Sequence, residues 1–190
     1  MNFFTVGFLL ALMQLDLGWG VGYIIKAAGA LFLFGGIAEL MPFEKSIVKH
    51  RPLAAMLLLA GAASAGAVFG LSKLGHNTAY NIAGLLSGVV TTAIAVLFFR
   101  KLFALLKERP DLAANEAELR RLSARFDRML FVTVLVLAAD ALNRFTGGTV
   151  VADAAGIVMV VTKLTFYCFL ISCGLSLNKI RQSFNKAHSA

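Results

Sequence analysis

The sequence predicts an all-α polytopic membrane protein, with six transmembrane helices arranged as three helical hairpins and both termini on the cytoplasmic side. Of its 190 residues, 59% are apolar and 15% are charged, whereas soluble domains are nearer half apolar and a quarter charged. The apolar residues also occur in long uninterrupted blocks, which is the pattern of membrane-spanning helices. The uneven distribution of Lys and Arg between the connections then predicts the orientation.

The expected spans cover residues 2–15, 22–41, 53–72, 80–99, 129–146 and 151–177. A spanning helix needs about 20 apolar residues, and the third and fourth segments meet this length. The first segment is short, so it would tilt little, thin the bilayer or lie in the interface. The fifth is apolar only from Met129 to Leu142, so it spans only if Asp140 and Asn143 enter the membrane or its outer edge. We expect residues 1–190 to form one transmembrane helical-bundle domain.

Basic residues gather in the connections that would share one side of the membrane. The connection 42–52 has three, the connection 100–128 has eight and the tail after residue 177 has three, whereas the other side has only Lys73 and Arg144. Cytoplasmic loops carry such an excess of Lys and Arg, so both termini should be cytoplasmic, in what we expect to be a bacterial cytoplasmic (inner) membrane. Anionic lipid of the inner leaflet accounts for the net charge of +8, so the bilayer is an expected partner and nucleic acid is not.

The connection 100–128 predicts a helical extension on the cytoplasmic side, between the fourth and fifth spans. Asn115 and Glu118 have the spacing of a capping box, and Glu116 can pair with Arg120 at i,i+4. One interpretation is a solvated extension that packs on its neighbours, and the other is a docking surface for a cytoplasmic protein. We favour the first, because a charged amphipathic face needs no partner.

Small residues spaced four apart form ridges that allow helices to approach closely in a membrane. Such ridges are expected at Gly7 and Ala11, at Ala62, Gly66 and Gly70, and at Gly84 and Gly88. Most of these ridges should serve packing within the bundle, and some would serve a second subunit in a homo-oligomer.

Several charged or polar residues fall at a similar depth below the outer turns, when residues are counted from each turn at about 1.5 Å per residue. This candidate outer charge layer consists of Lys26, Asp140, Asp153, Arg144 and Asn81. Its acids and bases should pair, because an unpaired charge inside a span is costly. The layer is then either a structural set of ion pairs that fixes the helix order or an outward-facing polar pocket.

Lys163 lies deeper, about fifteen residues below its turn and near the expected midplane. The groups expected at its depth are hydroxyls, from Thr91, Thr92, Thr165 and Ser64, which accept hydrogen bonds but do not neutralise an ammonium. Three interpretations follow: burial keeps the lysine neutral, its long side chain snorkels to the headgroups, or it lines a wet cavity and meets an anionic ligand. We favour snorkelling or structural pairing over the ligand role.

The sequence contains no recognisable catalytic constellation. All three histidines, His50, His76 and His188, fall in expected loops or the tail, so no span supplies a histidine base or metal ligand. A glycine-rich phosphate loop and a metal-ligand cluster are also missing from the sequence. We therefore expect no enzymatic activity, no cofactor and no bound metal.

The leading hypothesis is a small-solute transporter or a membrane subunit of a transport system, because Lys163 lies at the midplane beneath a layer of charges. The size and six-span topology are similar to those of the substrate-binding subunits of energy-coupling-factor transporters, although no motif accompanies that likeness. A single chain of this size is small for a complete carrier, so a homo-oligomer or a membrane or cytoplasmic protein partner would be needed. The alternative is a structural or assembly membrane protein that acts through helix packing and its basic cytoplasmic helix, without transport or catalysis.

Overall fold

The computed structural model of the chain describes residues 2–13, 21–75, 77–109, 116–145 and 150–188, and the regular elements in these ranges are all helices. The all-helical prediction is therefore confirmed for this part of the chain. The elements are α1 (Asn2–Leu12), α2 (Val21–Leu40), a short 3-10 helix η1 (Lys45–His50), α3 (Arg51–Leu74), α4 (Asn77–Glu108), α6 (Glu116–Phe145) and α7 (Val150–His188).

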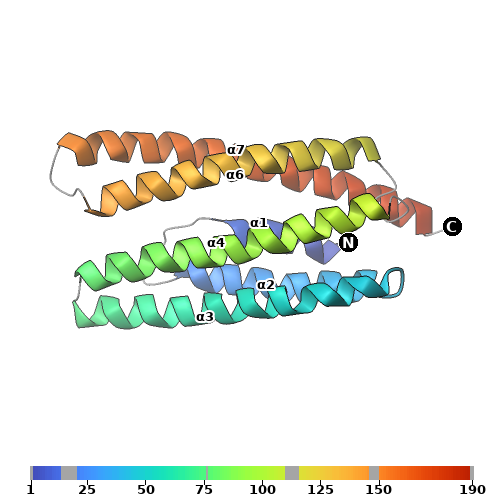
Figure 1. The fold of residues 1–190 in the computed structure, drawn as a ribbon, viewed down its shortest axis with the longest axis horizontal. Coiled ribbons are helices and arrows are strands. Elements are labelled where there is room, and N and C mark those ends of the chain that lie inside the picture. The colour runs from blue at the N-terminus through green and yellow to red at the C-terminus, as the bar shows by residue number, and fades with distance from the viewer. Residues whose placement is uncertain (1, 14–20, 76, 110–115, 146–149, 189–190) are drawn as a thin grey trace.

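The helices run roughly parallel to one long axis (Figure 1). Helices α2, α3 and α4 pack consecutively on one side, and α6 and α7 form an antiparallel pair on the other. The short α1 lies between the two sides and contacts α2, α4 and α7, while α4 also packs on α6. The helix α1 therefore joins the two halves of the bundle.

Local sequence features explain how α3 begins and ends. The side chain of Glu44 accepts a hydrogen bond from the Ser46 backbone N–H and so caps η1, and Pro52 lies in the first turn of α3, where its missing N–H costs nothing. At the other end Gly75 has a φ of 70°, a left-handed conformation that suits glycine. This glycine ends α3 and permits the tight turn into α4.

Within the described ranges, four helical segments are long and apolar enough to cross a membrane: Val21–Leu40, Lys45–Leu74, Asn77–Glu108 and Gly156–Lys186. The helix α1 has 11 residues, which gives it a length of about 16 Å, well short of a hydrocarbon core of about 30 Å. The helix α6 has 30 residues, but its first half is strongly charged. The count of six spans and the orientation of the termini remain predictions.

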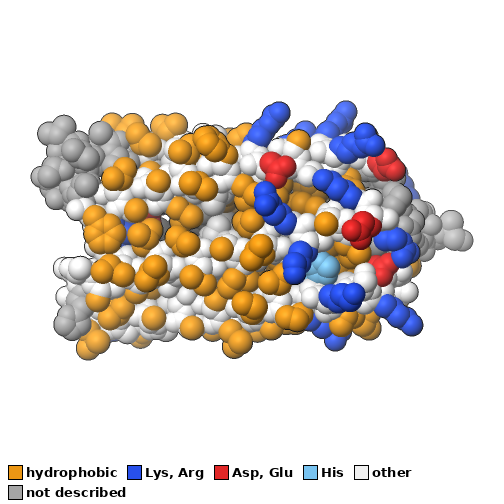
Figure 2. Space-filling model, in the orientation of Figure 1, with side chains coloured by type: hydrophobic (Ala, Val, Ile, Leu, Met, Phe, Trp, Pro, Cys, Tyr) orange, Lys and Arg blue, Asp and Glu red, His pale blue; other side chains and the backbone are white. Residues whose placement is uncertain are grey.

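Charged and apolar side chains are separated along the long axis. Figure 2 shows Lys and Arg gathered at one end, on the right, while hydrophobic side chains cover most of the remaining surface of that face. This is the end at which α2 runs into η1, α4 ends and α6 begins. The basic connections thus share one end of the bundle, which we call the basic end.

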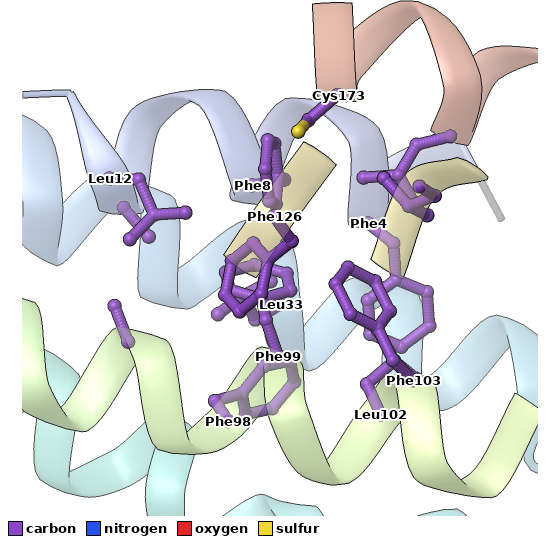
Figure 3. Packing of buried hydrophobic residues seen from close by; sticks show 14 of the residues in the cluster. Phe4, Phe8, Leu12, Leu33, Phe98, Phe99, Leu102, Phe103, Phe126 and Cys173 are labelled. Carbon is purple, nitrogen blue, oxygen red and sulfur yellow. The ribbon is translucent and has the colours of Figure 1, made fainter. Parts of the chain in front are cut away.

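A cluster of phenylalanines forms the core toward the basic end (Figure 3). Phe8 of α1 lies edge-on to Phe99 of α4 with ring centroids 4.8 Å apart, and Phe103 lies edge-on to Phe126 of α6 at 5.1 Å. Such edge-to-face pairs are favourable beyond the apolar area that they bury. Because Phe4 and Phe8 are almost fully buried, α1 behaves as a core element and not as a peripheral helix.

Glycines allow α1 and α2 to touch almost backbone to backbone. A Cβ at Gly29 would lie 2.6 Å from the Ala11 backbone nitrogen, and one at Gly36 would lie 2.7 Å from the Phe4 ring. By contrast, a Cβ at Gly66 or at Gly70 on α3 would have no described atom within 4 Å. The predicted ridge of Gly7 and Ala11 therefore serves packing inside the bundle, whereas the ridge of Ala62, Gly66 and Gly70 faces outward.

Candidate functional site

Lys26 of α2 is buried inside the bundle, with 5% of its side chain exposed. Its ammonium donates hydrogen bonds to the hydroxyls of Thr91, at 3.1 Å, and Thr92, at 3.3 Å, both on α4. The ammonium also lies 5.8 Å from the ring centroid of Tyr23, within the range of a cation–π contact. Lys26 therefore crosses from α2 to α4 and is held there by neutral groups.

The helix α4 presents these hydroxyls in a fixed orientation. The Thr91 hydroxyl donates to the Ser87 carbonyl at 2.7 Å, one turn earlier, as threonines within helices commonly do. Its oxygen lone pairs are thus left to accept from Lys26. Thr91 is fully buried and Thr92 nearly so, so both hydroxyls are shielded by the surrounding helices.

In the described part of the chain, no nearby acid balances the charge of Lys26. Among the residues that the structure describes, no carboxylate lies within ion-pair distance of the Lys26 ammonium. Hydroxyls solvate an ammonium but do not neutralise it, and an uncompensated charge is costly away from water. The residue is therefore an unusual member of an apolar bundle.

A second polar group lies nearer the opposite end from the basic end, where α4 meets α6. Arg144 forms an i,i+4 ion pair with Asp140 at 2.8 Å, and its backbone carbonyl accepts a hydrogen bond from Asn81 at 3.4 Å. The Arg144 guanidinium rests on Gly84, where an added Cβ would lie 3.0 Å from it. The Tyr23 hydroxyl donates to the Gly84 carbonyl at 2.5 Å. Gly84 thus links this ion pair to the surroundings of Lys26.

We call the whole set the polar cluster; its members are Tyr23, Lys26, Asn81, Gly84, Thr91, Thr92, Asp140 and Arg144. Three helices supply it, namely α2, α4 and α6. Its formal charge is +1, because Asp140 balances Arg144 and no acid within the cluster balances Lys26. An arrangement of this kind offers a buried cation and neutral hydroxyls to a small anionic or polar solute.

The structure groups these residues differently from the sequence-based expectation. Asp140, Arg144 and Asn81 come together as expected, but Lys26 lies deeper and contacts Thr91 and Thr92, the hydroxyls expected around Lys163. The side chain of Asp153 lies outside the described residues. The expected outer layer is thus an ion pair on α6 with a separate buried lysine beneath it.

The recessed start of α2 explains the deeper position of Lys26. Lys26 is the sixth residue of α2 and is level with Thr91, the fifteenth of α4. Both helices run in the same direction (Figure 1), so α2 begins about nine residues, or about 14 Å, inside the end at which α4 begins. Counting depth from the turn before α2 therefore underestimates how far Lys26 lies from the bundle end.

Lys163 lies on α7 and is partly exposed, beside the exposed side chains of Val160 and Leu164. Its ammonium makes no hydrogen bond or ion pair with any residue in the described part of the chain. Thr165 is exposed, and its hydroxyl donates to the Val161 carbonyl of its own helix at 2.9 Å. The hydroxyls expected around Lys163 therefore do not gather there.

Of those hydroxyls, Ser64 lies on α3 and is 8% exposed. It makes no hydrogen bond to Lys26 or to Lys163. Ser64 therefore belongs to neither lysine's surroundings.

A separate constellation at the basic end joins α6 to α7. The carboxylate of Glu118, whose residue is 5% exposed, accepts a hydrogen bond from the Ser176 hydroxyl at 2.9 Å, and Arg125 donates to the same hydroxyl at 2.6 Å. Arg121 and Lys179 lie 3.5 and 4.0 Å from the carboxylate. The Ser176 hydrogen bond, together with these cations, lowers the pKa of Glu118 below its ordinary value.

The spacing of Glu118 predicts a capping box with Asn115, which lies outside the described residues. The structure shows that Glu118 contacts α7. Its partner Ser176 comes 58 residues later, so no local pattern could have paired them. The pair between Glu116 and Arg120, which local spacing does predict, is present at 3.5 Å.

Known proteins give no further guide to this arrangement. Within the described residues, no group of three or more His, Cys, Asp or Glu side chains is placed to hold a metal ion. Comparison of the chain with protein-family models, with curated proteins and with solved structures found no match.

Proposed function

We propose that the chain is a small-solute membrane transporter, or the membrane subunit of a transport system, whose solute contacts Lys26. The observation that carries this proposal is the buried ammonium, held by Thr91 and Thr92 with no carboxylate partner among the described residues. Ionisable groups inside membrane-spanning segments are rare, and they commonly mark the pathway of a solute or ion. The proposal therefore places the solute site on Lys26 and not on Lys163.

The ion pair on α6 provides a comparison within the same chain. Asp140 and Arg144 neutralise each other one turn apart, which is how a charge with only a structural role is usually accommodated. Lys26 has no such partner within the described ranges, although a carboxylate could have replaced either threonine. A bound anion would supply the missing negative charge, so we assign Lys26 to ligand binding and the Asp140–Arg144 pair to support.

The recessed start of α2 favours access to Lys26 from the end opposite the basic end. In the proposed protein, a solute enters there and passes Tyr23 and Arg144 before it meets Lys26. Gly84 and Gly88, about one turn apart, carry no side chain on the face of α4 that meets Arg144 and Tyr23.

A substrate-independent test asks whether water reaches the site. In a background in which Cys168 and Cys173 are replaced by alanine, Thr92→Cys should react with a charged, water-soluble thiosulfonate added to cells or oriented vesicles. Ala95→Cys, one turn away and fully buried in the core, is the matched control and should stay unmodified. If neither cysteine reacts with the thiosulfonate, water does not reach the site at Lys26 and the proposal is contradicted.

A second test measures binding. Purified protein would be heated in the presence of a panel of small monocarboxylates, dicarboxylates, inorganic anions and neutral polar solutes, and a binder should raise the midpoint of unfolding. Lys26→Met should abolish the shift, whereas Lys163→Met should keep it. If a solute raises the unfolding midpoint of Lys26→Met as much as that of the wild type, Lys26 is not part of the solute site.

The alternative function, a structural or assembly protein, is supported by the outward ridge of Ala62, Gly66 and Gly70 on α3. Small residues on a lipid-facing helix surface permit close packing of another helix, and a Cβ at Gly66 or Gly70 would meet nothing within the described part of the chain. Gly66→Leu should then break a homo-oligomer, as measured by cross-linking in membranes. An unchanged cross-linking pattern would weigh against this alternative.

A further inference from the structure

An open groove of about 490 Å³ runs between α6 and α7 near the basic end. Its lining consists of Asp127, Arg128, Phe131, Val132 and Phe169. The groove lies outside the polar cluster and shares no residue with it. Its lining is charged at Asp127 and Arg128 and apolar at the other three residues.

The charged mouth of the groove carries an excess positive charge. Asp127 pairs across to Arg100 of α4 at 3.7 Å. Arg128 is exposed and forms no ion pair or hydrogen bond with the described residues. Arg100, which is not itself part of the lining, already neutralises Asp127, so Arg128 leaves the mouth with a formal charge of +1 among the described residues.

The rest of the groove is apolar. Phe131 follows Arg128 by three residues, less than one helical turn, and it is 68% exposed. Val132 forms a nearly buried floor, and Phe169 contributes from α7. A ligand that fills the groove must therefore be anionic at one end and hydrocarbon at the other.

We propose that this groove binds one anionic phospholipid, with the phosphate at Arg128 and an acyl chain along Phe131, Val132 and Phe169. Guanidinium groups match phosphate in bidentate geometry, and basic pockets beside membrane helices bind anionic head groups. The apolar length of the groove selects a lipid over a free phosphate ion. The bound lipid neutralises the mouth and covers an exposed phenylalanine.

The experiment reconstitutes the full chain in nanodiscs that contain equal amounts of phosphatidylcholine and phosphatidylglycerol, then counts the retained lipids by native mass spectrometry. Wild-type protein should keep one phosphatidylglycerol in preference to phosphatidylcholine. Arg128→Gln should weaken this retention by about tenfold, the loss expected for one charge-assisted hydrogen bond of about 1.5 kcal/mol. The matched control is Arg120→Gln, because Arg120 is an exposed arginine of the same helix, paired with Glu116 and absent from the groove lining.

Two further arms distinguish a whole lipid from a free phosphate ion in the groove. Phe131→Ala should also weaken retention, because it shortens the apolar wall without changing any charge. Inorganic phosphate should fail to displace the lipid at concentrations where added phosphatidylglycerol succeeds. The proposal is overturned if Arg128→Gln retains the lipid like the wild type, if Phe131→Ala has no effect, or if phosphate competes as well as lipid.

Discussion

Replacing Gly29 by alanine should force α1 away from α2. The added Cβ would lie 2.6 Å from the Ala11 backbone nitrogen and 3.0 Å from its Cα, whereas ordinary contacts begin at 3.4 Å. Since the obstacle is backbone, no side chain can rotate aside, and the two helices must separate by about 0.8 Å, the difference between 3.4 and 2.6 Å. A gap of this size forfeits between a quarter and a half of each contact's attraction.

We expect a loss of stability of about 1–3 kcal/mol, the usual result of inserting a methyl group into a close-packed interface. In a chain of this size that loss lowers the midpoint of thermal unfolding by about 2–4 °C for each kcal/mol. Gly7→Ala should cost less, because the nearest atom to its Cβ is the flexible end of Leu33 at 2.6 Å and the nearest backbone atom, the Leu33 nitrogen, is farther away at 3.1 Å. The assay is thermal unfolding of the purified variants in one detergent.

Gly66→Ala provides the matched control, because it adds the same methyl group to a glycine with no described atom within 4 Å of its Cβ. Its midpoint should equal that of the wild type or exceed it slightly, since alanine is the better helix former. The reasoning is refuted if Gly29→Ala unfolds at the wild-type temperature, or if Gly66→Ala is equally damaged.

Two other substitutions test the charged contacts. Glu118→Gln should lower the thermal midpoint at pH 7, because the amide still accepts from Ser176 but no longer carries the negative charge that faces Arg121 and Lys179. A charge-assisted contact of this kind is worth about 1.5–3 kcal/mol. Because folding lowers the pKa of Glu118, its stabilisation is complete above the unfolded pKa of about 4.3 and is lost as the pH falls through the folded value. The wild type should therefore lose more stability than Glu118→Gln between about pH 5 and pH 3, and parallel curves would contradict this assignment. Asp140→Asn should destabilise by about 3 kcal/mol, because it removes the largely buried ion pair with Arg144. The exchange Asp140→Arg with Arg144→Asp should recover part of the loss, and recovery of none would show that the pair is not the stabilising feature.

Much of the helical architecture follows from the sequence because it depends on local patterns. Long apolar blocks predict the helices, Pro52 and Gly75 lie where α3 begins and ends, and the spacing of Glu116 and Arg120 predicts their pair. These features involve residues close together in the chain, where one helical period determines which side chains meet. The same patterns do not determine how far one helix is shifted along another.

That shift is what separates the expected site from the observed one. The sequence-based expectation places Lys163 at the depth of Thr91 and Thr92, because depth is counted separately from each turn. In the structure Lys26 occupies that position. The recessed start of α2 brings Lys26 level with the threonines, while the rotation of α7 leaves Lys163 at the surface. Axial position and rotation depend on packing, such as the contact of Gly29 with Ala11, which no single segment encodes.

The central position of α1 constrains the order in which the chain can mature during its synthesis. At about 16 Å, α1 is too short to integrate stably as a separate span, and its packing partners include Phe126 of α6 and Gly174 of α7. Leu9 and Gly174 are 165 residues apart, so α1 is synthesised well before α7 can complete the packing surface around it. Chains released before α7 would leave the inner face of α1 open, which marks them for recognition by the membrane's quality-control proteases.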